Sequence, residues 1–260
     1  MQQPAFAIII PACDEASCIG PVLDELLARI DPEKFVVAVG VNGSRDRTAE
    51  IARARPVLVA ETERRGYGHG CIAAIRLTNN LFPSIRAYLF FAGDGASEPR
   101  ELHRLTNAFD QGYELVLGSR TRRLQNRRAM TFHHIIANAA LGLWAGCLGG
   151  RFFSDLGPLR LIGRPLFEKI EPQEMTYGWT IEAQIASAKL GATICELPVK
   201  ERRRIAGKQK VSGVSWRKTF VIGCAIVAAG WRTFRSFRPT PAGVSGAIVL
   251  RSTAGRRPIA

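Results

Sequence analysis

The sequence lacks the cysteine spacing and the long apolar runs that mark several common classes of protein. Its six cysteines form no CxxC pair, and none of its four histidines is spaced with them as zinc ligands are. We therefore expect reduced thiols in a cytoplasmic protein rather than a disulfide framework. No positive charge precedes the first apolar run, so no signal peptide is predicted. The uncharged run at residues 219–231 has 13 residues, fewer than the roughly 20 that cross a bilayer.

Acidic residues are scarce in the second half of the chain. Residues 1–120 hold 13 Lys and Arg against 15 Asp and Glu, a net charge of −2, whereas residues 121–260 hold 23 against 7, a net charge of +16. A surface of this charge meets anions such as nucleic acid, lipid headgroups or a phosphorylated substrate. The basic runs at residues 120–128 and 200–213 contain no aromatic side chain to stack bases, so we expect no nucleic acid partner.

Apolar strands alternate with amphipathic helices through the first half of the chain. We expect strands at residues 5–10, 35–41, 57–60, 88–91 and 114–118, joined by helices at 17–30, 48–54, 70–80 and 97–110. This alternation predicts an α/β fold with a mostly parallel central sheet and helices on both faces. The regularity then fades, with helices expected at residues 131–149, 166–170 and 179–190 and a strand at 192–199.

The segment at residues 214–238 combines an uncharged run with aromatic and basic flanks. The aromatic residues near the ends of the run are Trp216, Trp231, Phe234 and Phe237, beside flanking arginines. This composition suits an amphipathic helix on a membrane surface, and it also suits a core helix with a solvated basic end. Residues 239–260, rich in proline, glycine and arginine, are predicted to form a disordered basic tail.

Asp94 is the most informative single residue, because an apolar strand runs directly into it. In α/β folds such strands deliver side chains to the carboxyl edge of the sheet, where ligands bind. A carboxylate there is suited to a divalent metal, which in turn binds phosphates. The strand ends at residues 11–15 and 42–46 and the glycine-rich loop at residues 64–70 are expected at the same edge. The four segments therefore predict one crevice for a nucleotide diphosphate.

Taken in order, these motifs resemble glycosyltransferase family 2, in the branch of polyprenyl-phosphate sugar transferases that are like dolichyl-phosphate-mannose synthase. The segments that carry the resemblance are residues 8–15, 42–49, 66–70, 93–95, 117–120, 154–160, 177–182, 198–204 and 208–212. The resemblance implies a GT-A-like nucleotide-diphospho-sugar transferase fold. It also implies inverting transfer of a sugar from a UDP- or GDP-sugar to a polyprenyl phosphate or another acceptor.

The resemblance assigns roles to particular residues. It implies Mg²⁺ or Mn²⁺ at Asp94, and a donor pocket formed by Pro11, Asp14, Glu15, Asn42, Ser44, Asp46, Gly66 and Gly68. The candidate cations for the diphosphate or a lipid headgroup are Arg65, Arg120, Arg202, Arg203, Arg204 and Lys210. Glu182 is expected on the acceptor side. Asp155 is the candidate base for a hydroxyl acceptor, whereas a lipid phosphate would need orientation more than a base.

The same resemblance divides the chain into four segments. Residues 1–120 would bind the nucleotide sugar, and residues 121–213 would form a basic, acceptor-side half of the same domain. Residues 214–238 would be the amphipathic, membrane-associated helix, and residues 239–260 the tail. The protein is therefore expected in the cytoplasm, peripheral at the inner face of the plasma membrane.

Two departures from the family pattern leave alternatives open. Ala92 stands where the first acidic residue of the DxD motif is expected, and Val41 stands where an acidic residue precedes Asn42 in relatives. An inactive or donor-binding paralogue is therefore one alternative. A nucleotidyltransferase on a related fold is another, but it would need a basic glycine-rich loop after the first strand, and residues 11–17 contain no Lys or Arg.

Overall fold

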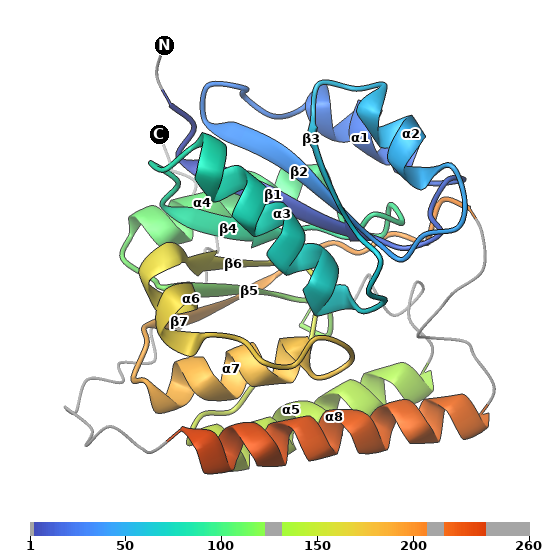
Figure 1. Cartoon of the computed structure of the whole chain (residues 1–260). Helices are drawn as coiled ribbons and strands as arrows, with labels where there is room; N and C mark the ends of the chain where they lie inside the picture. Colours follow the sequence, from blue (N-terminus) through green and yellow to red (C-terminus); the bar gives the residue numbers. More distant parts are fainter. Residues whose placement is uncertain (1–2, 123–131, 207–215, 238–260) are drawn as a thin grey trace, which may run out of the picture.

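A seven-stranded sheet forms the centre of the molecule, in a computed structural model that describes residues 3–122, 132–206 and 216–237 (Figure 1). The strands lie in the order β3-β2-β1-β4-β6-β5-β7. Their bounds are β1 (Phe6–Ala12), β2 (Phe35–Asn42), β3 (Leu58–Thr62), β4 (Ala87–Phe90), β5 (Leu115–Ser119), β6 (Arg160–Gly163) and β7 (Ile194–Pro198). The five strands expected in the first half and the late strand before residue 199 are all present, so the α/β prediction is confirmed.

β6 is the one strand that the sequence pattern did not predict, and it is antiparallel to both of its neighbours, β4 and β5. It has four residues, and a helix follows it without a loop. A run this short, opening on a charged residue at Arg160, gives no alternation that distinguishes a strand from a helix start. All other strand pairs are parallel.

Helices cover both faces of the sheet. They are α1 (Ile19–Leu27), α2 (Thr48–Arg53), α3 (Tyr67–Leu81), the short 3-10 turn η1 (Pro99–Glu101), α4 (Leu102–Asp110), α5 (Phe132–Gly149), α6 (Arg164–Ile170), α7 (Trp179–Lys189) and α8 (Trp216–Ser236). One apolar core joins the sheet to α1, α2 and α4. A second core joins the opposite face to α3, α6 and α7. Because both faces are buried, the central strands are almost continuously apolar.

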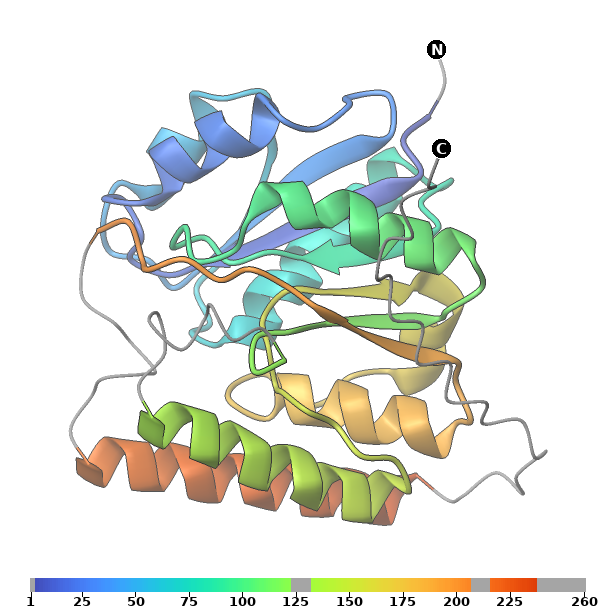
Figure 2. The same ribbon diagram turned by 180° about the vertical axis from the view of Figure 1, so that it is seen from behind.

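α5 and α8 lie side by side and form an additional layer outside α7 (Figures 1 and 2). Small residues permit this close packing. A Cβ atom at Gly230 would lie 2.4 Å from the Trp144 ring, and one at Gly178 would lie 2.4 Å from the Cβ of Ala229. The helix predicted within residues 214–238 is therefore present as α8. Within the described part of the chain, neither this helix nor any other is long and apolar enough to cross a membrane.

The topology brings six loops to one edge of the sheet. Because β6 is antiparallel to both β4 and β5, the latter two run in the same direction as β1 and β2. The segments that follow β1, β2, β3, β4, β5 and β7 therefore emerge together, and β6 begins at the same edge. The predicted basic tail at residues 239–260 lies outside the described residues, as do residues 123–131 and 207–215 of the two basic loops.

Candidate active site

Asp14 ties the loop after β1 to the loop after β2. Its φ of 53° turns the chain sharply out of the strand. Its backbone N–H donates to Ser44 Oγ at 2.8 Å, and its carboxylate accepts from the Arg45 backbone N–H at 2.7 Å and from the Arg65 guanidinium at 2.8 Å. The structure thus brings together two of the predicted donor-pocket residues, Asp14 and Ser44, and the candidate cation Arg65.

Asp46 makes a second link between these two loops. Its carboxylate accepts hydrogen bonds from the backbone N–H of Ala16 and of Thr48, each at 3.0 Å. The Thr48 hydroxyl, fully buried, in turn accepts from the Glu15 backbone N–H at 2.8 Å. These bonds fix the backbone from which Asp14 and Glu15 project. Asp46 therefore has a positioning role in the structure, and its predicted contact with substrate stays a prediction.

The glycine-rich loop requires glycine because other backbone approaches it closely. Gly66 has a φ of 142°, and a Cβ atom there would lie 2.4 Å from the Met175 carbonyl oxygen. The Gly68 N–H donates to the same carbonyl at 3.0 Å. A Cβ atom at Gly70 would lie 2.8 Å from Oδ1 of the buried Asn42. The glycine-rich loop is thereby held between the end of β2 and the segment that precedes α7.

Asp94 and Glu15 flank one cation, the guanidinium of Arg204. Arg204 forms an ion pair with Glu15, and its Nη1 lies 3.5 Å from Asp94 Oδ2. The side chains of Arg204 and Glu15 are each 10% exposed, whereas that of Asp94 is 30% exposed. The Ile205 N–H donates to the Asp94 carbonyl at 3.0 Å, so the loop after β7 lies directly on the Asp94 loop. Three predicted site residues therefore meet at the carboxyl edge of the sheet.

The carboxylate oxygens of Asp94 fit a divalent cation that a bound phosphate ligand would help to coordinate. Among the described residues, no group of three or more His, Cys, Asp or Glu side chains forms a metal site on its own. Mg²⁺, however, is commonly held by one or two carboxylates together with substrate phosphates. One Asp94 oxygen accepts the Ala96 N–H, and the other has, among the described residues, the long contact to Arg204 described above. Asp94 thus offers a hard carboxylate oxygen at a place where a cation is already favoured, and its role as a metal ligand stays a prediction.

Arg120 lies between two carboxylates on the other side of this edge. Its Nε and Nη2 donate to Asp155 at 2.8 and 2.9 Å, and its backbone N–H donates to Asp155 at 2.8 Å. Its Nε also lies 3.2 Å from Glu201. Burial acts to lower the pKa of Arg120, but Asp155 and Glu201 outweigh it and hold that pKa above its usual value. The cation is thus permanently charged and fixed in orientation.

Glu201 is a member of this cluster that sequence analysis missed. Burial raises the pKa of its carboxyl to about 7; the charge of Arg120 opposes the rise, and the carboxylates of Asp155 and Asp94 add to it. The residue lies inside the basic run at residues 200–213, where a single acid among arginines gave no distinguishing signal. Its isolated bridge to Ser97 places it beside the Asp94 loop.

Several predicted residues lie away from the Asp94 cluster or outside the described chain. Arg202 forms a two-bond ion pair with Glu25 on α1, with both distances 2.9 Å, and its Nη2 also donates to the Ser97 carbonyl at 3.0 Å. Glu182 is buried on α7 and accepts the backbone N–H groups of residues 173 and 174, each at 2.9 Å. Arg203 is exposed, and Lys210 lies outside the described residues. The substrate roles of these four residues stay predictions.

Sequence comparison identifies the class to which this fold and site belong. The family described as Glycosyl transferase family 2 matches residues 7–170. A dolichyl-phosphate hexose transferase of Haloferax volcanii is 31% identical over 207 residues, which cover 79% of this chain and 86% of the relative. The chain therefore belongs to glycosyltransferase family 2 and is a glycosyltransferase, as the resemblance in its motifs indicated.

Solved structures support the same fold. Glucosyl-3-phosphoglycerate synthase from Mycobacterium tuberculosis, in complex with Mn²⁺, UDP and glucosyl-3-phosphoglycerate, has a TM-score of 0.68 to this structure at 19% identity, covering 90% of this chain and 80% of that one. A complex of that enzyme with Mg²⁺ and UDP has a TM-score of 0.65. The GT-A fold predicted for this chain is therefore confirmed.

Proposed function

We propose that the protein transfers a hexose, with inversion, from a UDP- or GDP-sugar to a polyprenyl phosphate. The observation that carries the proposal is the meeting of Asp94, Glu15 and Arg204 at the carboxyl edge of the sheet. This edge is where open α/β sheets bind their ligands. The choice of a lipid acceptor is supported by the relative named as a dolichyl-phosphate hexose transferase.

The donor nucleotide is proposed to lie over the loops that Asp14 and Asp46 tie together. Hydrogen bonds connect Asp14 to both Ser44 and Arg65, so a carboxylate, a hydroxyl and a guanidinium lie close together for contact with the nucleotide. Mg²⁺ or Mn²⁺ held by Asp94 and the donor diphosphate would offset the negative charge that develops on the leaving nucleoside diphosphate. Arg204, which already lies at Asp94, would contribute to the same electrostatic stabilisation.

The proposed reaction needs little proton transfer. An oxygen of the lipid phosphate forms the new bond to the anomeric carbon from one face, while the bond to the donor phosphate breaks on the other, so the configuration inverts. The attacking oxygen is already anionic, and the departing diphosphate takes the bonding electron pair. Arg120, fixed by Asp155, would hold the acceptor phosphate. In this proposal Asp155 positions Arg120, and it serves as a base only if the acceptor is a hydroxyl.

The acceptor lipid is proposed to be reached at a membrane surface through the α5–α8 pair. Among the described residues of this pair, five large apolar side chains are exposed, namely Leu143, Phe220, Val221, Val227 and Trp231, at 56, 70, 64, 43 and 45%. Residues 220, 224, 227 and 231 recur at helical spacing along the outer side of α8. Basic residues follow at Arg232 and Arg235. An apolar stripe with basic flanks suits peripheral contact with anionic lipid.

The proposal is tested by product analysis with purified protein. UDP- and GDP-hexoses, labelled in the sugar, are incubated with Mn²⁺ and a short polyprenyl phosphate in detergent, and the organic phase is counted. We expect one donor to give a labelled lipid whose anomeric configuration is opposite to that of the donor. Transfer to glycerol 3-phosphate alone would contradict the lipid acceptor, and no turnover with any donor would favour the inactive paralogue.

A further inference from the structure

Arg160 is a buried cation for which the chain supplies no carboxylate. Its side chain is 1% exposed, and none of its three guanidinium nitrogens has a hydrogen-bond partner among the described residues. All 22 Asp and Glu residues of the chain lie in the described segments, and none of them forms an ion pair with Arg160. The undescribed segments contain no Asp or Glu that could do so. No Asp or Glu side chain of this sequence therefore supplies the counter-charge.

Aromatic rings account for only part of the stabilisation that a buried guanidinium needs. The Arg160 guanidinium carbon lies 5.1 Å from the Phe90 ring centre and 5.9 Å from that of Tyr67. Such contacts are favourable, but an unpaired charge removed from water is strongly unfavourable without a counter-charge and hydrogen bonds. The buried Tyr67 hydroxyl lies near the same guanidinium and Cys71, without a hydrogen bond of good geometry. The five guanidinium N–H donors of Arg160 thus have an unmet requirement.

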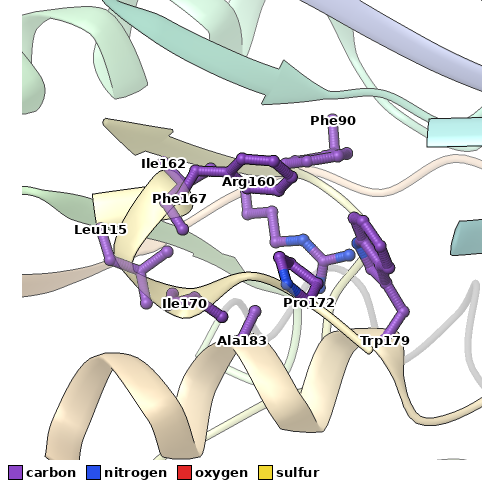
Figure 3. Close-up of a pocket in the computed structure, with 9 residues that line it drawn as sticks. All are labelled: Phe90, Leu115, Arg160, Ile162, Phe167, Ile170, Pro172, Trp179 and Ala183. Atoms are coloured by element: carbon purple, nitrogen blue, oxygen red, sulfur yellow. The ribbon is translucent and has the colours of Figure 1, made fainter. Parts of the chain in front are cut away.

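A small cavity lies beside the guanidinium (Figure 3). Apart from Arg160, its lining is apolar and includes Phe90, Pro172 and Trp179. Arg160 is the one charged residue of the lining, and its guanidinium points toward Pro172 and Trp179 in Figure 3. The cavity has a volume of about 10 Å³, which is far too small for an organic anion. A water molecule would satisfy some donors but would leave the charge unbalanced, and a phosphate group is too large.

We propose that this cavity is a monovalent anion site, which takes a chloride-sized ion against the Arg160 guanidinium. The site lies where the first residue of β6 pairs with Phe90, the last residue of β4, four residues before Asp94. The anion completes the core between the sheet and α7 and stabilises β4, the strand that leads into the Asp94 loop. The site belongs to the fold and does not depend on the donor or acceptor.

Thermal unfolding in two salts tests the site. Sodium chloride replaces sodium gluconate at constant ionic strength, because gluconate is too large for the cavity. We expect the wild-type Tm to rise with chloride, by roughly 3–6 °C at ten times Kd, and to continue rising with the logarithm of the chloride concentration. An unchanged Tm across the series would overturn the proposal.

Two variants separate this site from a general salt effect. Arg160→Met removes the charge and is expected to unfold at or above the wild-type temperature in gluconate, without any rise in chloride. Arg76→Met removes an exposed arginine of α3 and is the matched control, which keeps the full chloride response. An equal chloride response in Arg160→Met and the wild type would contradict the assignment.

Crystallography of the wild-type protein gives a result that does not depend on the variants. Crystals grown in bromide are measured at the bromine absorption edge, and an anomalous peak is expected within hydrogen-bond distance of the Arg160 guanidinium. Absence of that peak would overturn the proposal even if Arg160→Met failed to fold. Stabilisation by inorganic phosphate but not by chloride would overturn it in favour of a larger oxyanion.

Discussion

Arg120 and Asp155 form a buried, two-pronged ion pair, with guanidinium-to-carboxylate distances of 2.8 and 2.9 Å and an additional bond from the Arg120 backbone. The Asp155 side chain is 1% exposed. Because the pair joins the end of β5 to the loop before β6, it holds the antiparallel strand against the rest of the sheet. The same bonds aim Arg120 along the edge where Asp94 lies. The Asp155 carboxylate therefore serves both the stability of the sheet and the position of Arg120 in the proposed reaction.

Asp155→Ala should lower the free energy of unfolding by about 3–5 kcal/mol, because it removes the carboxylate that accepts three hydrogen bonds from the buried Arg120. Urea unfolding measures this change. Asp24→Ala is the matched control, since Asp24 binds Arg55 with the same two-pronged geometry at the surface and should change stability little. If the two variants lost the same free energy of unfolding, burial would not be the reason that the Arg120–Asp155 pair stabilises the fold.

Asp94→Asn should reduce sugar transfer at least about 100-fold, because the amide cannot balance the charge of a divalent cation. The variant should also lose the effect of Mn²⁺ on nucleotide binding, while its Tm stays close to that of the wild type. Steady-state kinetics with the preferred donor measures the loss. Asp110→Asn, which alters an exposed pair with Arg86, serves as the control. Unchanged turnover in Asp94→Asn would end the metal assignment.

Glu201 should make the protein less stable as the pH rises from about 4.5 to 7. The folded protein keeps the Glu201 proton up to a pKa of about 7, whereas the unfolded chain releases it near 4.5. The folded state therefore binds more protons in this window, and its stability falls with pH, by about 3 kcal/mol in total. Glu201→Gln should remove that slope in denaturation series measured in EDTA. Persistence of the slope in Glu201→Gln would assign it to another group.

The outer side of α8 should govern binding to lipid vesicles. Phe220→Glu combined with Trp231→Glu places charges on two exposed apolar positions, and should weaken binding to anionic vesicles at least about tenfold. Vesicle co-sedimentation measures the partition. Leu81→Glu is the control, because Leu81 is 52% exposed on α3, outside the α5–α8 pair. If all three substitutions had the same small effect, the proposed membrane surface would be wrong.

The sequence predicted the edge of the sheet well, for a physical reason. Buried parallel strands must be apolar along their whole length, so each strand end is marked by the first polar residues, as at Asp14, Asn42 and Asp94. Parallel direction then places those ends together without any knowledge of side-chain contacts. The family comparison and the topology agree with this inference. The contacts of these residues with a ligand stay predictions.

The sequence could not distinguish the three consecutive arginines after β7. Their directions are set by backbone bonds of an irregular loop, from the Arg202 N–H to Ala96 and from the Ile205 N–H to Asp94. Those bonds send Arg202 to Glu25 and Arg204 to Asp94. Arg160 was likewise hidden, because a charged residue in a short segment gives no sign of burial. Both features depend on tertiary contacts that local pattern does not encode.

Calorimetric binding of nucleotides tests the central claim most directly. UDP, GDP and their hexose derivatives are titrated into the folded protein with Mn²⁺ and again with EDTA. The account predicts that one base is preferred, and that its binding is lost in EDTA and in Asp94→Asn. Failure of every nucleotide to bind in Mn²⁺ would contradict it, and would mean that Ala92 and Val41 mark a donor site that has been lost.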